Sequence, residues 1–173
     1  MQPVVEESLD LKRLLVIDDD LVFRSDLALT LARWGYDVRE AAGGLEGLRL
    51  MSEWRPHLVL CDVCMPQVAG RQLRQYLNNM DAIYSDIIFF FVSSIPAEKL
   101  AMLSAEGGAD AWYTKPIETE RLRADIEKHL TTANREKNPD DDASFELSQI
   151  AVSAGLIAAV IFAACCNAGY LVM

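Results

Sequence analysis

Residues 14–20 read LLVIDDD, an apolar run that stops abruptly at a run of aspartates. A short run without polar alternation is typical of a strand buried on both faces, and such strands are found in parallel sheets. Two further runs have this form, LVLC at residues 58–61 and IIFFFV at residues 87–92, and each is followed directly by a polar residue. These three runs predict the central strands of a parallel sheet.

The segments between these runs carry apolar residues at helical spacing, such as Phe23, Leu27 and Leu31 before Gly35. The sequence predicts five strands, at residues 14–17, 36–41, 58–61, 87–92 and 111–114. It predicts five helices, between residues 20 and 35, around 45–51, and at 72–80, 96–105 and 118–130. Strict alternation of strand and helix, with right-handed crossovers, indicates an α/β fold with a doubly wound parallel sheet.

Doubly wound sheets place their functional sites beyond the carboxyl ends of the strands. The polar residues that follow the predicted strands are Asp18, Asp19, Asp62, Ser93 and Lys115. We therefore expect these five side chains to meet at one edge of the sheet.

This set of side chains is suited to phosphoryl transfer. Three carboxylates repel one another, and an oxygen-ligand site of this kind favours Mg²⁺ as the neutralising cation. A serine hydroxyl and a lysine ammonium can each bind a phosphoryl oxygen. With an aspartate as nucleophile, the expected product is an aspartyl phosphate.

The motifs together resemble the CheY-like receiver domain of two-component response regulators, over roughly residues 12–130. The resemblance rests on Asp18-Asp19, on LVLCDVCMP at residues 58–66 with Gly70, on VSS at 92–94 and on YTKP at 113–116, in this order. It implies a flavodoxin-like sheet with strand order 2-1-3-4-5. It also implies a signalling domain that catalyses only transfer to and from its own aspartate, and that is not otherwise an enzyme.

The resemblance implies a role for each residue of the acidic group. Asp62 would accept the phosphoryl group from a histidine kinase or a phosphotransfer protein. Asp19 and Asp62 would bind Mg²⁺ directly with the backbone carbonyl of Cys64, while Asp18 would act mainly through water. Asp20 extends the acidic pair and is not expected to be a ligand.

The resemblance also implies the parts that respond to phosphorylation. Ser93 and Lys115 would bind the phosphoryl oxygens, and Ser93 and Trp112 would form the conformational switch. The Lys115–Pro116 peptide bond would be cis. The signal would pass to a downstream protein through the face formed by the fourth helix, the fifth strand and the fifth helix.

The motifs leave one alternative to a phosphorylated receiver. A pseudo-receiver, which has this fold and binds a protein without being phosphorylated, is the alternative. A flavin carrier is disfavoured because the acids after the first strand have the wrong charge for a phosphate loop. Cys61 and Cys64 form a single C-x-x-C pair, which lacks the other two ligands of a zinc site and is interpreted as structural.

The remaining predictions concern charge and the ends of the chain. The net charge of −10 argues against nucleic acid as a partner. Residues 1–11 form an extension without a signal-peptide pattern, so the receiver is expected in the cytoplasm. Residues 131–148 read as an acidic linker.

Residues 149–173 are predicted to form an apolar helix. The span 150–173 is uncharged and long enough to cross a bilayer core of about 30 Å. It is interpreted either as a membrane anchor on the inner face of the membrane or as a helix that packs on protein, including in a homodimer.

Overall fold

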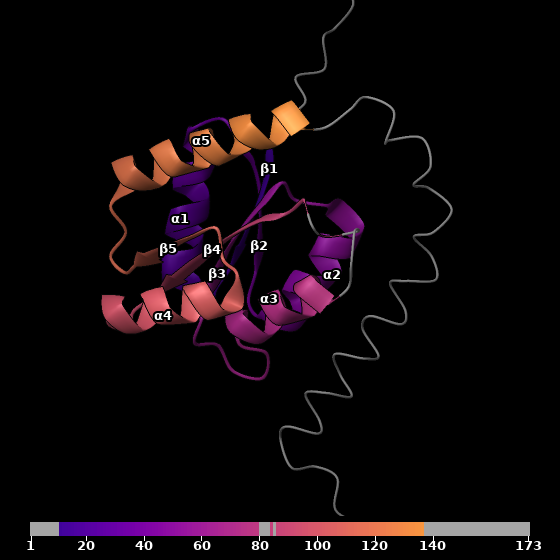
Figure 1. Cartoon of the computed structure of the whole chain (residues 1–173). Helices are drawn as coiled ribbons and strands as arrows, with labels where there is room; N and C mark the ends of the chain where they lie inside the picture. Colours follow the sequence, from indigo (N-terminus) through magenta and orange to yellow (C-terminus); the bar gives the residue numbers. More distant parts are fainter. Residues whose placement is uncertain (1–10, 80–83, 85, 137–173) are drawn as a thin grey trace, which may run out of the picture.

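All five strands of the sheet run parallel, in the order β2-β1-β3-β4-β5. The computed structural model describes residues 11–79, 84 and 86–136, and Figure 1 shows the sheet at their centre. The strands are β1 Arg13–Ile17, β2 Asp37–Ala41, β3 Leu58–Asp62, β4 Ile88–Ser93 and β5 Ala111–Thr114. The predicted α/β class, the doubly wound sheet and its strand order are confirmed.

Helices cover both faces of the sheet (Figure 1). They are α1 Leu21–Arg33, α2 Gly44–Trp54, α3 Gly70–Asn79, α4 Ala97–Gly107 and α5 Thr119–Glu136. Helices α1 and α5 pack on one face, in a core cluster that includes Leu31 and Ile126, whereas α2, α3 and α4 pack on the other. The central strands β1, β3 and β4 are therefore shielded from water on both faces.

This double coverage explains the apolar runs that mark the central strands. In β1, Leu14 and Val16 face the α1/α5 cluster, while Leu15 and Ile17 face the opposite cluster, and all four are almost completely buried. Successive side chains of a strand point to opposite faces. A strand between two layers of helices must therefore be apolar at every position.

The register of the strands brings their carboxyl ends to one edge of the sheet. Ile17 pairs with Cys61, the residue before Asp62, and Asp62 in turn pairs with Val92, the residue before Ser93. Ser93 pairs with Thr114, directly before Lys115. The polar residues that end these strands are consequently neighbours in space although they are far apart in sequence.

The last helix differs from its predicted extent. Helix α5 continues to Glu136, whereas the sequence predicted its end at residue 130. Leu130 is buried, and the hydroxyls of Thr131 and Thr132 donate to carbonyls one turn earlier, at 2.7 and 3.0 Å. The helix thus continues for six residues beyond the buried Leu130.

The predicted extension at residues 1–11 lies outside the described residues except for its last position, and the linker does so beyond residue 136. The predicted apolar helix at 149–173 lies entirely outside them. Among the helices that the structure describes, none has both the length and the apolar character needed to cross a membrane. The membrane anchor therefore stays a prediction from sequence.

Candidate functional site

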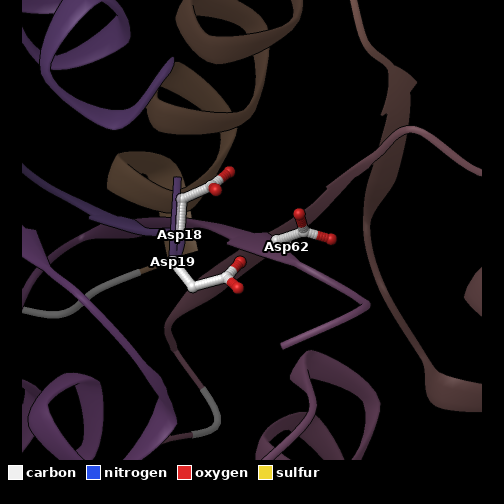
Figure 2. Close-up of side chains that lie close together, drawn as sticks. All are labelled: Asp18, Asp19 and Asp62. Carbon is white, nitrogen blue, oxygen red and sulfur yellow. The ribbon is translucent and has the colours of Figure 1, made fainter. Parts of the chain in front are cut away.

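The loop after β1 presents its three aspartates in three different ways. Asp18 is only 1 % exposed, and one of its carboxylate oxygens accepts a hydrogen bond from the Asp20 N–H at 3.0 Å. Asp20 caps α1 by accepting from the N–H groups of Val22 and Phe23. Asp19 is exposed, and its carboxylate points toward the same space as that of Asp62 (Figure 2). Asp20 thus serves as the N-cap of α1.

Asp62 ends β3 and is 7 % exposed. Its Oδ1 accepts a hydrogen bond from the backbone N–H of Cys64 at 2.8 Å, so the following turn orients the carboxylate. The backbone of Gly70, at the start of α3, lies so close that a Cβ there would meet the Asp62 carbonyl oxygen and the Cys61 sulfur. The first residue of α3 therefore packs tightly against the backbone of Asp62.

Lys115 joins the two buried aspartates. Its Nζ lies 2.6 Å from Asp18 Oδ2 and 2.8 Å from Asp62 Oδ2, and the ring of Phe23 lies 4.2 Å from the same nitrogen. The backbone N–H of Lys115 donates to the Ser93 carbonyl, which ties the end of β5 to the end of β4. The Lys115–Pro116 bond is cis, as the resemblance implied.

Ser93 brings a hydroxyl to the same edge of the sheet. It ends β4, beside Asp62 on β3, and is 1 % exposed. Its Oγ has no hydrogen-bond partner among the described residues. A buried hydroxyl without a partner is costly, so this donor is available to a ligand oxygen that enters the site.

Charge and burial oppose each other in this cluster. Burial raises the pKa of Asp18, and the nearby charge of Asp62 adds to the effect, although hydrogen bonds from Lys115 and the Asp20 N–H act the other way. Burial alone would lower the pKa of Lys115, but its hydrogen bonds to Asp18 and Asp62 outweigh burial and raise it. The lysine thus stays charged, and one ammonium faces more negative charge than it can offset.

The remaining negative charge is suited to a divalent cation. One oxygen from each of Asp18, Asp19 and Asp62 lies within 4.8 Å of the others. Oxygens on opposite sides of an octahedral Mg²⁺ are about 4.2 Å apart, so small side-chain adjustments bring these ligands into range. Hard oxygen donors of this kind match Mg²⁺ better than a soft metal.

Three further residues singled out in the sequence, Trp112, Cys61 and Cys64, differ in their surroundings. Trp112 is partly buried against the α2–α4 core, and the Arg121 guanidinium lies 5.8 Å from its ring centre. Cys61 is fully buried and Cys64 is exposed, and both are free thiols. Burial raises the pKa of Cys61 well above its ordinary value, with the Asp62 charge as a second cause, which disfavours a reactive thiolate.

The sequence alone did not indicate two contacts of α1 with the site. Phe23 was interpreted only as a core position of its helix, yet its ring lies over Lys115. Arg24 is buried and its guanidinium donates to the Asp18 carbonyl at 2.6 Å. A charged residue between the apolar positions of a helix is a weak signal, since most such residues are exposed.

A family model described as the response regulator receiver domain matches residues 14–127 of the chain. The chain is 34% identical over 132 residues to the transcriptional regulatory protein AfsQ1 of Streptomyces coelicolor, and the match covers 76% of this chain and 56% of that protein. It is 29% identical over 123 residues to the DNA-binding dual master transcriptional regulator RpaA of Synechocystis, covering 71% of this chain and 51% of the regulator. The chain thus spans about half the length of these curated relatives.

Solved structures share the fold. A CheY-like receiver domain protein from Methanospirillum hungatei superposes with a TM-score of 0.66 at 27% identity, covering 73% of this chain and 99% of that one. The chemotaxis protein CheY4 of Vibrio cholerae gives a TM-score of 0.63 at 25% identity, covering 69% and 99%.

The prediction that nucleic acid is not a partner is wrong in the light of these relatives. Two of them are transcriptional regulators, and RpaA is a DNA-binding one. The net charge of −10 describes only the surface of this chain. It gives no information about the half of each relative that the chain does not span. The net charge of this chain therefore does not exclude nucleic acid as a partner.

Proposed function

This chain belongs to the response regulator receiver domain family, and from that premise we propose that it signals through Mg²⁺-dependent phosphorylation of Asp62. The observation that carries the proposal is the shared pairing of Lys115 with the carboxylates of Asp18 and Asp62 at the carboxyl edge of the sheet. Receiver domains are signalling modules. The chemistry proposed here is confined to the chain's own aspartate.

Asp62 is the proposed nucleophile. A carboxylate oxygen attacks the phosphorus of a phosphohistidine on a histidine kinase or phosphotransfer protein, forming a P–O bond. The P–N bond breaks, and its electron pair stays on the imidazole nitrogen of the donor. The N–H of Cys64 at 2.8 Å supports this assignment, because it holds one carboxylate oxygen and fixes the direction of the other.

The neighbours of Asp62 neutralise and orient the phosphoryl oxygens. Lys115 lies within hydrogen-bond distance of Asp62 and can bind a phosphoryl oxygen once that oxygen replaces the carboxylate contact. Ser93 offers a buried hydroxyl without a partner for a second oxygen. Such transfers depend mainly on positioning and charge neutralisation.

Asp18, Asp19 and Asp62 would hold Mg²⁺, with the Cys64 carbonyl as a further ligand. The bound ion would offset the charge of the carboxylates and of the incoming phosphoryl group. In response, Ser93 and Trp112 are proposed to shift between two arrangements, which a downstream component distinguishes. The partly buried position of Trp112 leaves room for such a change in exposure.

The decisive experiment treats the complete 173-residue chain with acetyl phosphate and follows its intact mass. We expect a phosphoryl adduct that forms in the presence of Mg²⁺ and does not form when EDTA is added beforehand. Asp62→Asn, which keeps the size of the side chain but not the nucleophile, should give none. A wild-type chain that neither forms the adduct nor responds to beryllofluoride would instead indicate the pseudo-receiver alternative.

Control of transcription is the class of output that the relatives favour, since AfsQ1 and RpaA are transcriptional regulators. We expect the native host to express a different set of transcripts when its own copy carries Asp62→Asn. Identical RNA profiles under conditions in which the wild-type protein is phosphorylated would contradict a transcriptional output.

A cytoplasmic location accompanies this proposal. The thiols of Cys61 and Cys64 are free, as is usual in a reducing compartment. Cell fractionation with an antibody against the chain tests the location, and recovery in the periplasmic or secreted fraction would contradict it.

A further inference from the structure

Arg24 is a buried charged residue that the phosphorylation chemistry does not use. It lies in α1, one turn after the acidic loop, and only 8 % of it is exposed. Arginine is rarely buried this far unless its charge and its N–H groups are paired. The partners of its guanidinium therefore indicate what the residue is for.

One partner of Arg24 is the backbone of the acidic loop itself. Its Nη1 donates to the carbonyl oxygen of Asp18 at 2.6 Å, while its Nε lies 3.3 Å from Glu40 Oε2 on β2. The Ser25 hydroxyl donates to the same Glu40 oxygen at 3.0 Å. The guanidinium thus connects the acidic loop to β2, and its shorter contact is with the loop.

The Asp18 carbonyl belongs to the peptide group that leads into Asp19. Because a peptide group is planar, holding this carbonyl also fixes the orientation of the Asp19 nitrogen and α-carbon. Asp18 has further anchors, since its N–H donates to the Ala41 carbonyl and its carboxylate binds Lys115. The exposed Asp19 side chain depends most on the direction of its backbone for meeting the other carboxylates.

We propose that Arg24 is a positioning residue for the acidic cluster. It holds the Asp18–Asp19 peptide so that the Asp19 carboxylate faces those of Asp18 and Asp62, and it thereby sets the affinity of the site for a divalent cation (Figure 2). The inference rests on the proposed function, because it concerns the Mg²⁺ site on which that function depends. Residues that orient metal ligands typically change metal affinity about 10- to 100-fold when they are removed.

The test measures the Mg²⁺ dissociation constant of the complete chain by isothermal titration calorimetry, together with thermal stability in EDTA. We expect Arg24→Gln to weaken Mg²⁺ binding about tenfold. Arg24→Lys should fall between this variant and the wild type, because one ammonium keeps the charge but not the planar fork. Arg49→Gln is the matched control, since Arg49 also pairs with a glutamate, Glu53, but on the exposed surface of α2. It should bind Mg²⁺ as the wild type does.

The outcomes separate the inference from the proposed function. If Arg24→Gln is less stable in EDTA yet binds Mg²⁺ as the wild type does, Arg24 only joins α1 to β2 and the inference is wrong. If Arg24→Gln does not fold, an unchanged dissociation constant in Arg24→Lys leads to the same conclusion. A wild-type chain that does not bind Mg²⁺ would overturn the Mg²⁺ dependence of the proposed function, and the inference with it.

Discussion

The ammonium of Lys115 is shared by two buried carboxylates and covered by the ring of Phe23. Removing charges from water is costly, and a single cation offsets only part of the repulsion between Asp18 and Asp62. The raised pKa of Asp18 reflects this imbalance. Removing the negative charge of Asp18 should therefore stabilise the protein, whereas removing one partner of an ordinary ion pair destabilises it.

Asp18→Asn is expected to stabilise the metal-free protein, by on the order of 1 kcal/mol. The amide oxygen can still accept from the Asp20 N–H, and Lys115 loses its contact with Asp18 Oδ2 but keeps its pairing with Asp62. The buried negative charge of Asp18 and its repulsion from Asp62 are removed. Urea unfolding in EDTA measures the change. Asp26→Asn, an exposed substitution on α1, is the control, and a destabilised Asp18→Asn would show that the ion pair outweighs burial.

Tyr113 leads to a prediction about alkaline pH. Burial raises its pKa well above the ordinary value of 10.0, and the hydrogen bond from its hydroxyl to Asp125 at 2.7 Å acts in the same direction. The unfolded chain therefore loses this proton at lower pH than the folded protein does. The contribution of Tyr113 to stability is complete below pH 10 and declines as the pH rises above it.

Spectrophotometric titration of phenolate should consequently show one tyrosine that ionises only when the protein unfolds. Tyr113→Phe should lack that step and should lose less stability between neutral and alkaline pH. Tyr36→Phe serves for comparison, because the pKa of Tyr36 is also raised by burial but without a hydrogen bond of this kind. A Tyr113 that titrates near its ordinary pKa in the folded protein would contradict the prediction.

Helices α1 and α3 position the site through their first turns. Helix α1 is capped by Asp20, and its first turn supplies Phe23, whose ring lies against Lys115, and Arg24, which donates to the Asp18 carbonyl. Helix α3 begins with Gly70, whose backbone lies against the Asp62 carbonyl. The elements that follow β1 and β3 thus hold both strand ends in place.

Gly70→Ala should destabilise the protein by about 1–3 kcal/mol, because the added methyl group must displace the Asp62 backbone or the Cys61 sulfur. It should also slow phosphorylation by acetyl phosphate, since the Asp62 carboxylate would move with its backbone. Gly43→Ser is the matched control. Open space surrounds Gly43 at the N-cap of α2, and serine is a favourable capping residue. Equal stability of the two variants would show that the loop after β3 yields easily.

At the scale of the whole molecule, the acidic cluster connects loops after β1 and β3 and reaches β5 through Lys115. These loops come together only in the folded state. A cation that needs all of them should therefore bind the folded protein and not the unfolded chain.

Mg²⁺ should then raise the free energy of unfolding with the logarithm of its concentration, by about 2.7 kcal/mol at one hundred times its dissociation constant. Urea unfolding at several Mg²⁺ concentrations measures this dependence. Asp19→Asn should shift this rise to higher Mg²⁺ concentrations, because the site loses one carboxylate, and Asp19 is exposed and can be replaced without disturbing the core. A rise over the same Mg²⁺ concentrations in the variant and the wild type would remove Asp19 from the set of ligands.

Local patterns in the sequence were sufficient to determine the class of fold and the identity of the five polar residues at the strand ends. Strands buried on both faces must be apolar throughout, so LLVI at 14–17 and LVLC at 58–61 marked their own ends and the polar residues that follow. Parallel strands share one carboxyl edge, which brings Asp18, Asp62 and Ser93 together in any sheet of this order.

Only the tertiary structure decided how those residues and their neighbours interact. Lys115 contacts Asp18, Phe23 covers Lys115 and Arg24 holds the Asp18 carbonyl, and these contacts depend on how α1 packs over the end of the sheet. The local pattern around Phe23 and Arg24 is that of a helix with apolar residues at four-residue spacing, Phe23, Leu27 and Leu31. A pattern of this kind tells which face of a helix is buried, but the rotation and depth of the helix against its neighbours, which set side-chain distances, follow from the packing of the entire core.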